Sequence, residues 1–194
     1  MDDAILKNKK IHQATLLAYK GNQKVAELSK GSMTSDSSFA IASISKLYTH
    51  AMAFRLIDKK LFDYTSRLVD LLPAGMVGNL PNATEVTVRH LLDQTSGFAN
   101  HEIDKLPDGS VLFEEILQHD RLVSVEESLR LVSELPAKGK PGERAYYADI
   151  NALLLGEICQ KITDKTLLEL LEELICHPLE LTNTHYYKLN EESI

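Results

Sequence analysis

The 194-residue sequence has no tryptophan, only two cysteines and no long apolar run. Cys159 and Cys176 are too few for a disulfide framework, and each lies in an apolar, helix-like stretch, which predicts buried free thiols. No stretch approaches the roughly 20 apolar residues of a membrane span. Residues 1–4 have neither the basic start nor the apolar core of a signal peptide. We therefore expect a cytoplasmic protein as the sequence stands, whereas a removed leader would imply a periplasmic or secreted one.

Positive charge is scarce as well. The chain has 21 Lys and Arg against 28 Asp and Glu, a net charge of -7. Nucleic acid is therefore not an expected partner, because phosphate binding needs clustered Lys and Arg. The seven histidines form no H-x-x-x-H pair and there is no C-x-x-C, so no metal ligand set is predicted. We expect a small-molecule substrate and no metal or organic cofactor.

The residues that are present predict one α+β domain over residues 1–194. Residues 11–30 have two strand-like runs around Gly21-Asn22, which indicates a β-hairpin. Residues 43–180 are mostly helical in pattern, with expected helices at 43–59, 68–72, 87–92, 110–119, 124–135, 149–163 and 166–175. A two-stranded hairpin is marginal by itself, and only residues 184–187 resemble another strand. We therefore predict a helical lobe packed on an antiparallel sheet that is incomplete in this chain.

Ser43 and Lys46 are the first candidates for chemistry. Three positions apart on a helix, their side chains share a face, and a lysine whose pKa is lowered by burial can take a serine proton. The motif alone is weak, since roughly one S-x-x-K arises by chance in a chain of this length. The alternative is that Ser43 caps the helix and Lys46 is solvated, although a cation is unfavourable in the first helical turn.

Other polar residues are weaker candidates. Ser96, in Thr95-Ser96-Gly97, does not match the G-x-S-x-G nucleophile motif and is predicted to lie in a turn that ends a helix. Nothing pairs a histidine with Ser43 or Ser96, which favours surface or interface positions for three histidines: His90, His101 and His119.

Four segments occur in order along the chain: FAIASISK at 39–46, VTVRHLLDQTSGF at 86–98, PGERAYYADINALLLG at 141–156 and LELTNT at 179–184. In that order they resemble the nucleophile, T-S-G, Y-x-N and L-x-M-T-x-T segments of the class C β-lactamase family, C-terminally truncated here. This penicillin-binding serine hydrolase family also includes D-alanyl-D-alanine peptidases and esterases. Four ordered matches are far more specific than S-x-x-K alone.

The resemblance implies a role for each matched residue. Ser43 would form the acyl-enzyme, Lys46 would assist its deprotonation, and Tyr147 would relay a proton to the leaving group. Without the motif, Tyr147 would be interpreted as a core aromatic residue. Tyr146 is adjacent, but the spacing to Gly156 favours Tyr147 as the tyrosine of Y-x-N.

The chain departs from the family pattern in two places. Asp149 occupies the substrate-binding position where asparagine is usual. A carboxylate only accepts hydrogen bonds, so Asp149 could pair with Lys46, keep it charged and repel a substrate carboxylate, which favours esters over β-lactams. The third motif, K-T-G or H-x-G on a later strand, is not found. The loss of one oxyanion-hole donor typically lowers the rate by ~10²–10³.

The resulting prediction is a serine hydrolase that acts through a Ser43 acyl-enzyme on a β-lactam, a D-amino-acid peptide or a small ester. The alternative is a catalytically impaired, truncated homologue that acts as a binding or assembly module. An open sheet edge also favours self-association or pairing with a separate C-terminal fragment.

Overall fold

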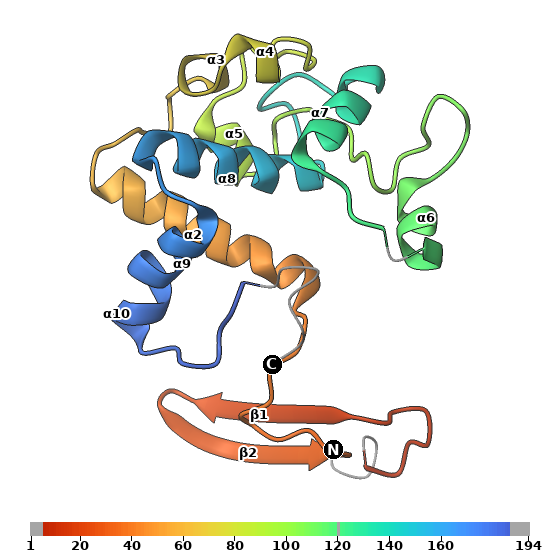
Figure 1. Ribbon diagram of the computed structural model, residues 1–194, viewed down its shortest axis with the longest axis vertical. Helices are drawn as coiled ribbons and strands as arrows, with labels where there is room; N and C mark the ends of the chain where they lie inside the picture. The colour runs from red at the N-terminus through yellow and green to blue at the C-terminus, as the bar shows by residue number, and fades with distance from the viewer. Residues whose placement is uncertain (1–5, 120, 187–194) are drawn as a thin grey trace. The chain divides into compact units, whose positions relative to one another are not determined.

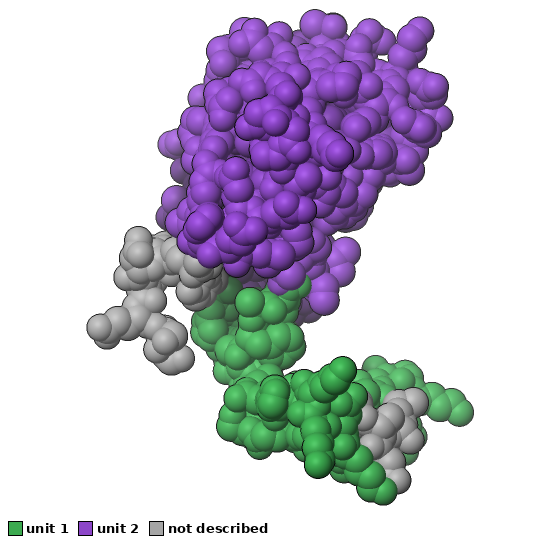
Figure 2. All heavy atoms as spheres, turned by 90° about the vertical axis from the view of Figure 1, so that its right-hand side faces the viewer, with its two compact units in different colours: residues 1–41, 181–194 green, residues 42–180 purple. Residues whose placement is uncertain are grey.

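The computed structural model describes residues 6–119 and 121–186. The chain divides into two compact units (Figure 2). The first contains the described residues up to 41 together with those from 181, and the second spans residues 42–180. Within the first unit, Asn183 is bonded to residues 36–38: its carbonyl accepts a hydrogen bond from Ser38 Oγ at 3.4 Å, and its amide donates to the Asp36 carbonyl at 3.5 Å.

The first unit contains the predicted hairpin. Strands β1 (Ala14–Lys20) and β2 (Gln23–Lys30) pair in antiparallel register, from Ala14 opposite Lys30 to Lys20 opposite Gln23 (Figure 1). Gly21 has φ 59°, a left-handed conformation that glycine adopts readily in a tight turn. In the described part of the chain these two strands form the whole sheet. Residues 184–186 form no strand, and Tyr187, the last residue of that predicted strand, lies outside the described residues.

The second unit is helical, as predicted (Figure 1). Its elements are η1 (Ala42–Ile44), α2 (Ser45–Asp58), α3 (Leu68–Leu71), α4 (Ala74–Val77), α5 (Val88–Leu92), α6 (Leu112–His119), α7 (Val125–Glu134), α8 (Asp149–Thr163), α9 (Leu167–Leu171), η2 (Glu172–Cys176) and α10 (His177–Leu179). The expected helix start at Ser43 is wrong by two residues. Ser43 lies in the 3₁₀ turn η1, and Ala42 before it has φ 45°, so the α-helical backbone begins only at Ser45.

Helix α8 forms the centre of the core of this unit. Its apolar residues Ile150, Leu154, Leu155 and Ile158 are fully buried, which explains why the sequence here is apolar on more than one face. Helix α2 packs against it through its own buried residues, and this contact fixes the two elements that carry the candidate site. Both cysteines are buried free thiols, as predicted, and burial raises the pKa of the Cys159 thiol to about 12.

Two loops of the second unit are joined by hydrogen bonds at the base of the site. Three backbone pairs, each 2.8 Å long, connect the T-S-G turn to the segment before α8: Lys138 N to Gly97 O, Gly142 N to Thr95 O and Tyr146 N to Gln94 O. The Gln94 side chain adds acceptor contacts to Ala148 N at 2.9 Å and to Asn151 Nδ2 at 2.7 Å. These bonds hold the chain on either side of Tyr147 in place.

Glycine is required in the T-S-G turn. Gly97 has φ 78°, and a β-carbon there would overlap the carbonyl oxygen of Gly139. Ser96 is buried, and its Oγ accepts a hydrogen bond from Phe98 N at 3.2 Å. Its predicted place in a turn after α5 is therefore confirmed.

Candidate active site

Ser43 lies at the exposed end of α2, in the turn that precedes the helix. Lys46 follows in the first turn of α2, and its Nζ donates a hydrogen bond to Ser43 Oγ at 3.1 Å. Lower down the same helix, the buried side chains of Met52, Ala53 and Leu56 hold it in the core. The serine and lysine that the spacing placed on one face are therefore in direct contact.

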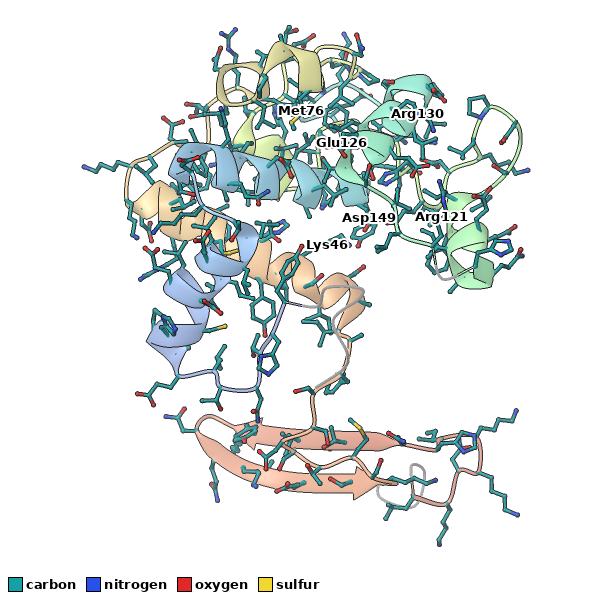
Figure 3. The ribbon with its side chains drawn as sticks, in the orientation of Figure 1. Lys46, Met76, Arg121, Glu126, Arg130 and Asp149 are labelled. Carbon is teal, nitrogen blue, oxygen red and sulfur yellow. The ribbon has the colours of Figure 1, made fainter. Side chains whose placement is uncertain are left out.

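Tyr147 and Asp149 come to the same place from the segment that enters α8. The Tyr147 hydroxyl donates to Ser43 Oγ at 3.0 Å and lies 3.3 Å from Asp149 Oδ1. Asp149 is the first residue of α8, and its carboxylate forms an ion pair with Lys46 (Figure 3). The structure thus brings together all four residues that the sequence singled out.

The ion pair decides the resting protonation state of Lys46. The side chains of Lys46 and Asp149 are only 20% and 10% exposed. Burial lowers the pKa of Lys46, but hydrogen bonds and charge from Asp149 and Tyr147 outweigh it and raise that pKa above its ordinary value. The ammonium group also lies 5.5 Å from the centroid of the Tyr147 ring. The sequence analysis considered a Lys46 with a pKa lowered by burial; the net effect is the opposite, and Lys46 is held as a cation.

Asn100 is a site residue that the sequence did not reveal. It is fully buried, and its Nδ2 donates to Asp149 Oδ2 at 2.9 Å and to the Tyr147 carbonyl at 3.3 Å. Its Oδ1 accepts a hydrogen bond from the backbone N–H of Glu102 at 3.1 Å. The one signal in the sequence for a buried polar residue here was that Asn100 directly follows the apolar pair Phe98-Ala99. This signal is weak.

Glu102 is a second residue that the sequence did not reveal. Its side chain is partly buried. Burial and the negative charge of Asp149 raise the pKa of the Glu102 carboxyl, and the positive charge of Lys46 offsets part of this effect.

The three histidines considered from the sequence have different surroundings. The surface or interface position expected for His101 is wrong: it is 1% exposed, and burial lowers the pKa of its imidazole. His90 instead accepts a hydrogen bond from Thr87 N at 3.2 Å at the start of α5, and His119 is exposed at the end of α6. In the described part of the chain, no histidine makes a hydrogen bond to Ser43.

Tyr146 forms a different network from its neighbour. Its hydroxyl donates to Asp104 Oδ1 at 2.7 Å, and Lys138 Nζ lies 2.9 Å from the same oxygen. The arrangement repeats the lysine, tyrosine and aspartate of the candidate site, but without a serine. The adjacent tyrosines are therefore distinguished by their partners, with Tyr147 bonded to Ser43.

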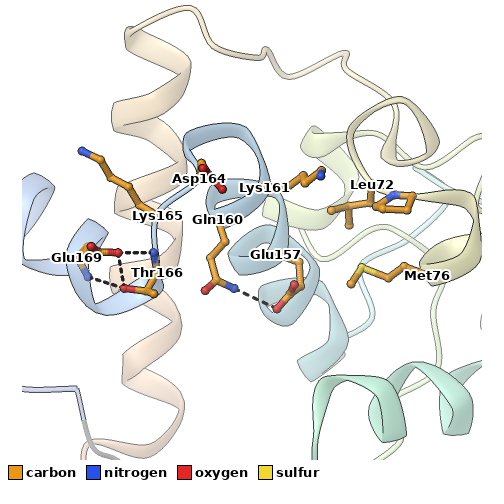
Figure 4. Close-up of a pocket in the computed structure, with 10 residues that line it drawn as sticks. Leu72, Met76, Glu157, Gln160, Lys161, Asp164, Lys165, Thr166 and Glu169 are labelled. Carbon is orange, nitrogen blue, oxygen red and sulfur yellow. Dashed lines mark hydrogen bonds between the residues drawn. The ribbon is translucent and has the colours of Figure 1, made fainter.

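A hollow of about 430 Å³ lies elsewhere on the helical unit (Figure 4). It is lined by residues between Leu72 and Met76 and between Glu157 and Glu169. Several of its polar groups bond to one another: Gln160 donates to Glu157, and Thr166 and Glu169 form the capping box of α9. None of the four candidate catalytic side chains lines it, so it does not contribute to the site around Ser43.

The described geometry can now be compared with known proteins. The sequence model of the beta-lactamase family matches residues 2–193. The chain belongs to the beta-lactamase family. Among curated relatives, it is 25% identical over 86% of its length to beta-lactamase-like protein 2 of Dictyostelium discoideum. It is 27% identical over 78% of its length to the D-alanyl-D-alanine-carboxypeptidase/endopeptidase AmpH of Escherichia coli.

Solved structures of the beta-lactamase family type share the fold. A D-stereospecific amidohydrolase from Streptomyces sp. matches with a TM-score of 0.77 and 22% identity, over 93% of this chain and 53% of that one. The predicted α+β fold of the β-lactamase and transpeptidase type is therefore confirmed. The chain spans 29% and 37% of the length of the two curated relatives. Within the described residues, no helix is long and apolar enough to cross a membrane.

Proposed function

We propose that Ser43 is the nucleophile of a serine hydrolase, that Lys46 and Tyr147 handle its proton, and that Asp149 lies on the substrate side of the same site. One observation carries the proposal: Ser43 Oγ accepts hydrogen bonds from both Lys46 Nζ and Tyr147 Oη, at 3.1 and 3.0 Å. A serine that only capped α2 would bond to backbone amides of the first turn instead. A titratable group within hydrogen-bond reach of a serine hydroxyl can act as the base that activates it as a nucleophile.

The proposed reaction begins when Lys46 or Tyr147 has lost a proton. As Ser43 Oγ bonds to the substrate carbonyl carbon, its proton passes to that group. The proton then goes to the leaving nitrogen or oxygen while the bond from the carbonyl carbon to that atom breaks, which leaves an ester on Ser43. Water attacks this ester by the reverse sequence and releases the acid.

The charge of Asp149 bears on the choice of substrate. Its carboxylate offsets the positive charge of Lys46, so the site has little attraction for a substrate carboxylate. A β-lactam carries such a carboxylate. D-alanyl peptides with a free C-terminus carry one as well, so we place small esters and D-amino-acid amides ahead of both β-lactams and such peptides. The names of AmpH and of the Streptomyces amidohydrolase agree with peptide and amide substrates for those two proteins.

A second candidate function is a catalytically impaired module for binding or assembly. The observation that favours it is the same ion pair, because a lysine held as a cation is a poor base. Assembly could use the free edges of β1 and β2, which pair with no other described strand. A second copy or a separate chain segment would then complete the sheet.

Covalent labelling separates these functions. The full chain is treated with a fluorescent fluorophosphonate and with a fluorescent penicillin. We expect fluorophosphonate labelling that is lost in Ser43→Ala and kept in Ser45→Ala, a matched control at an exposed serine two residues away. Labelling by penicillin at an equal rate would contradict the proposed order of substrates. No Ser43-dependent label from either reagent would overturn the catalytic proposal and favour the binding module.

A further inference from the structure

Asn100 is a buried amide that bonds to two site residues at once. Its Nδ2 donates to Asp149 Oδ2 at 2.9 Å and to the Tyr147 carbonyl at 3.3 Å, and its Oδ1 accepts from Glu102 N at 3.1 Å. These partners fix the orientation of the amide, because a carboxylate and a carbonyl only accept hydrogen bonds and a backbone N–H only donates. The donor end of the side chain is therefore used on the segment that carries Tyr147 and Asp149.

Tyr147 depends on its main chain for its position. The residue is 47% exposed, so packing holds little of the ring, yet its hydroxyl reaches Ser43 Oγ at 3.0 Å. Gln94 bonds to the backbone N–H groups on either side of Tyr147, and Asn100 bonds to the Tyr147 carbonyl. Asn100 thus joins the main chain of the tyrosine to the carboxylate of Asp149.

Asp149 uses the same amide. Its side chain is largely buried, with Oδ1 paired to Lys46 and Oδ2 bonded to Asn100. Without the amide, Oδ2 would lose this donor in a buried place, which is costly, and the carboxylate could turn either oxygen towards Lys46. The amide therefore fixes which oxygen meets Lys46, and with it the direction from which the lysine reaches Ser43.

A purely structural role for Asn100 would use the other end of the amide. Its Oδ1 supports the loop at Glu102, and this support needs the acceptor alone. The bond to Asp149 is the shortest of the three side-chain bonds, and it is strengthened by the charge of its acceptor. The main connection of the amide is therefore to the site.

We propose that Asn100 is a positioning residue: its amide donor holds Asp149 and Tyr147 where these residues, together with Lys46, serve the nucleophile Ser43. This inference rests on the proposed function of Ser43. Asn100 acts through these residues rather than on the substrate. A misplacement of about 1 Å can lower a rate about 100-fold, so a residue that only positions catalytic groups can control much of the rate.

The first test separates the donor of the amide from its acceptor. Asn100→Asp has the same shape and keeps an oxygen for Glu102 N, but it replaces the donor by a second oxygen facing Asp149. The full chain and the variant are labelled with a fluorophosphonate. Its reaction forms the Ser43 O–P bond, breaks the P–F bond and releases fluoride and the serine proton to the solvent. We expect labelling of Asn100→Asp at pH 9 to be about 10–100-fold slower, because small displacements of catalytic groups have effects of this size.

The pH profile identifies the lost donor as the cause. Two carboxylates 2.9 Å apart share a proton up to an unusually high pH, and the protonated acid can donate in place of the amide. The deficit of Asn100→Asp should therefore be small at pH 6 and grow towards pH 10. Asn100→Leu has neither a donor nor a titratable group, so its deficit should be about 10–100-fold at every pH. This variant decides the test if the charged one does not fold.

Asn82→Asp is the matched control. The Asn82 amide also joins two loops, since its Nδ2 donates to the Gly139 carbonyl at 3.4 Å. The ratio of its labelling rate to the native rate should not change between pH 6 and pH 10.

A rescue variant exchanges the two partners. In the Asp149→Asn background, Asn100→Asp again places a donor opposite an acceptor without a shared proton. Its effect on the labelling rate at pH 9 should therefore be at least about tenfold smaller than in the native background, as expected for two residues in direct contact. Equal effects in the two backgrounds would show that the bond between these side chains does not position the site.

The second test needs no reaction at Ser43. The chain is labelled with carbon-13 at the Cζ atom of tyrosine, and the Tyr147 signal is identified by its loss in Tyr147→Phe. Ser43→Ala should shift this NMR signal, because the Tyr147 hydroxyl donates to Ser43 Oγ. In Asn100→Leu the same change should shift the signal much less, since the tyrosine is no longer held against Ser43.

The two tests distinguish the inference from the function beneath it. A Tyr147 shift that depends on Asn100, without Ser43-dependent labelling of the native chain, would support the positioning role and overturn the hydrolase. Labelling of Asn100→Leu at the native rate, or a deficit in Asn100→Asp that does not change with pH, would overturn the role of the amide donor and leave the hydrolase standing. An equal shift of the Tyr147 signal with and without Asn100→Leu would also overturn that role.

Discussion

Replacing Asp149 with asparagine tests whether its carboxylate restrains Lys46. The side chain keeps its size and one oxygen acceptor, but it loses its negative charge. Burial lowers the pKa of Lys46, while the hydrogen bond of Asp149 is the largest effect that raises it, followed by the hydrogen bond of Tyr147 and the charge of Asp149. In Asp149→Asn burial remains and the two effects of Asp149 are weakened. We therefore expect a larger neutral fraction of Lys46 near neutral pH and a faster transfer of the Ser43 proton.

The magnitude follows from the contact between the two charges. An opposite charge in direct contact typically changes a pKa by about one to three units, and each unit is worth about 1.4 kcal/mol, a tenfold change in the neutral fraction. We expect the rate constant for fluorophosphonate labelling of Ser43 to rise at least about tenfold at pH 7.5. The pH range over which the labelling rate increases should also shift down towards neutral pH. The measurement is the labelling rate by intact-protein mass spectrometry from pH 6 to pH 10.

A stability cost accompanies the gain in rate. Asparagine offers only one oxygen where the carboxylate of Asp149 accepts on two sides, from Lys46 and from Asn100. One donor is left without an acceptor, which lowers the free energy of unfolding by about 1–3 kcal/mol. The matched control is Asp104→Asn, which removes a carboxylate bonded to a lysine and a tyrosine away from Ser43. A folded Asp149→Asn variant that labels no faster than the native chain would refute the reasoning.

Three further predictions concern stability and reactivity. Gly97→Ala should lower the free energy of unfolding, measured in urea, by about 2–4 kcal/mol, because residue 97 has a φ of 78° and a β-carbon there would overlap Gly139. The control Gly75→Ala, which has open space around it, should change the free energy of unfolding by less than about 1 kcal/mol. Equal effects of the two substitutions would contradict this account. Burial raises the pKa of Asp104, but its hydrogen bonds to lysine and tyrosine outweigh it and lower the pKa below 3.8. Its contribution to stability is thus present above pH 3.8 and lost as the pH falls below it, so the free energies of unfolding of Asp104→Asn and of the native chain in urea should converge in acid. The Cys159 thiol, buried and with its pKa raised to about 12, should react with a disulfide reagent at pH 8 at least about 100-fold faster in urea than in the folded chain; comparable rates would show that it is accessible.

Much of the fold could be predicted because its signals are local. The hairpin follows from two apolar runs around Gly21, and α8 follows from an apolar periodicity that spans most of its length. The start of α2 could not be placed correctly. It depends on a left-handed conformation at Ala42, and alanine has no preference for this conformation that a sequence pattern would reveal.

The candidate site likewise contains residues that the sequence revealed and residues that it did not. The spacing of Ser43 and Lys46 predicted their contact, although Ser43 lies in the turn η1 before α2, whereas Tyr147 was found only through ordered motifs. Asn100 and Glu102 lie in a loop whose position is set by hydrogen bonds to the segment before α8, and no periodicity encodes such pairs. The burial of a single loop histidine has no periodic signature either.

Asp149, where the resemblance to the family leads us to expect asparagine, is complemented by a second residue. A carboxylate at this position has two acceptor oxygens, and the structure gives each a donor: Lys46 on one and Asn100 on the other. An asparagine facing Asn100 Nδ2 with its oxygen would turn its own NH₂ group towards the Lys46 ammonium. Asp149 and Asn100 are therefore complementary, and Asn100 in turn fixes the backbone of Glu102. The carboxylate that pairs with Lys46 thus belongs to the same hydrogen-bond network as Asn100, so in Asp149→Asn the donors of Lys46 and Asn100 would compete for a single oxygen.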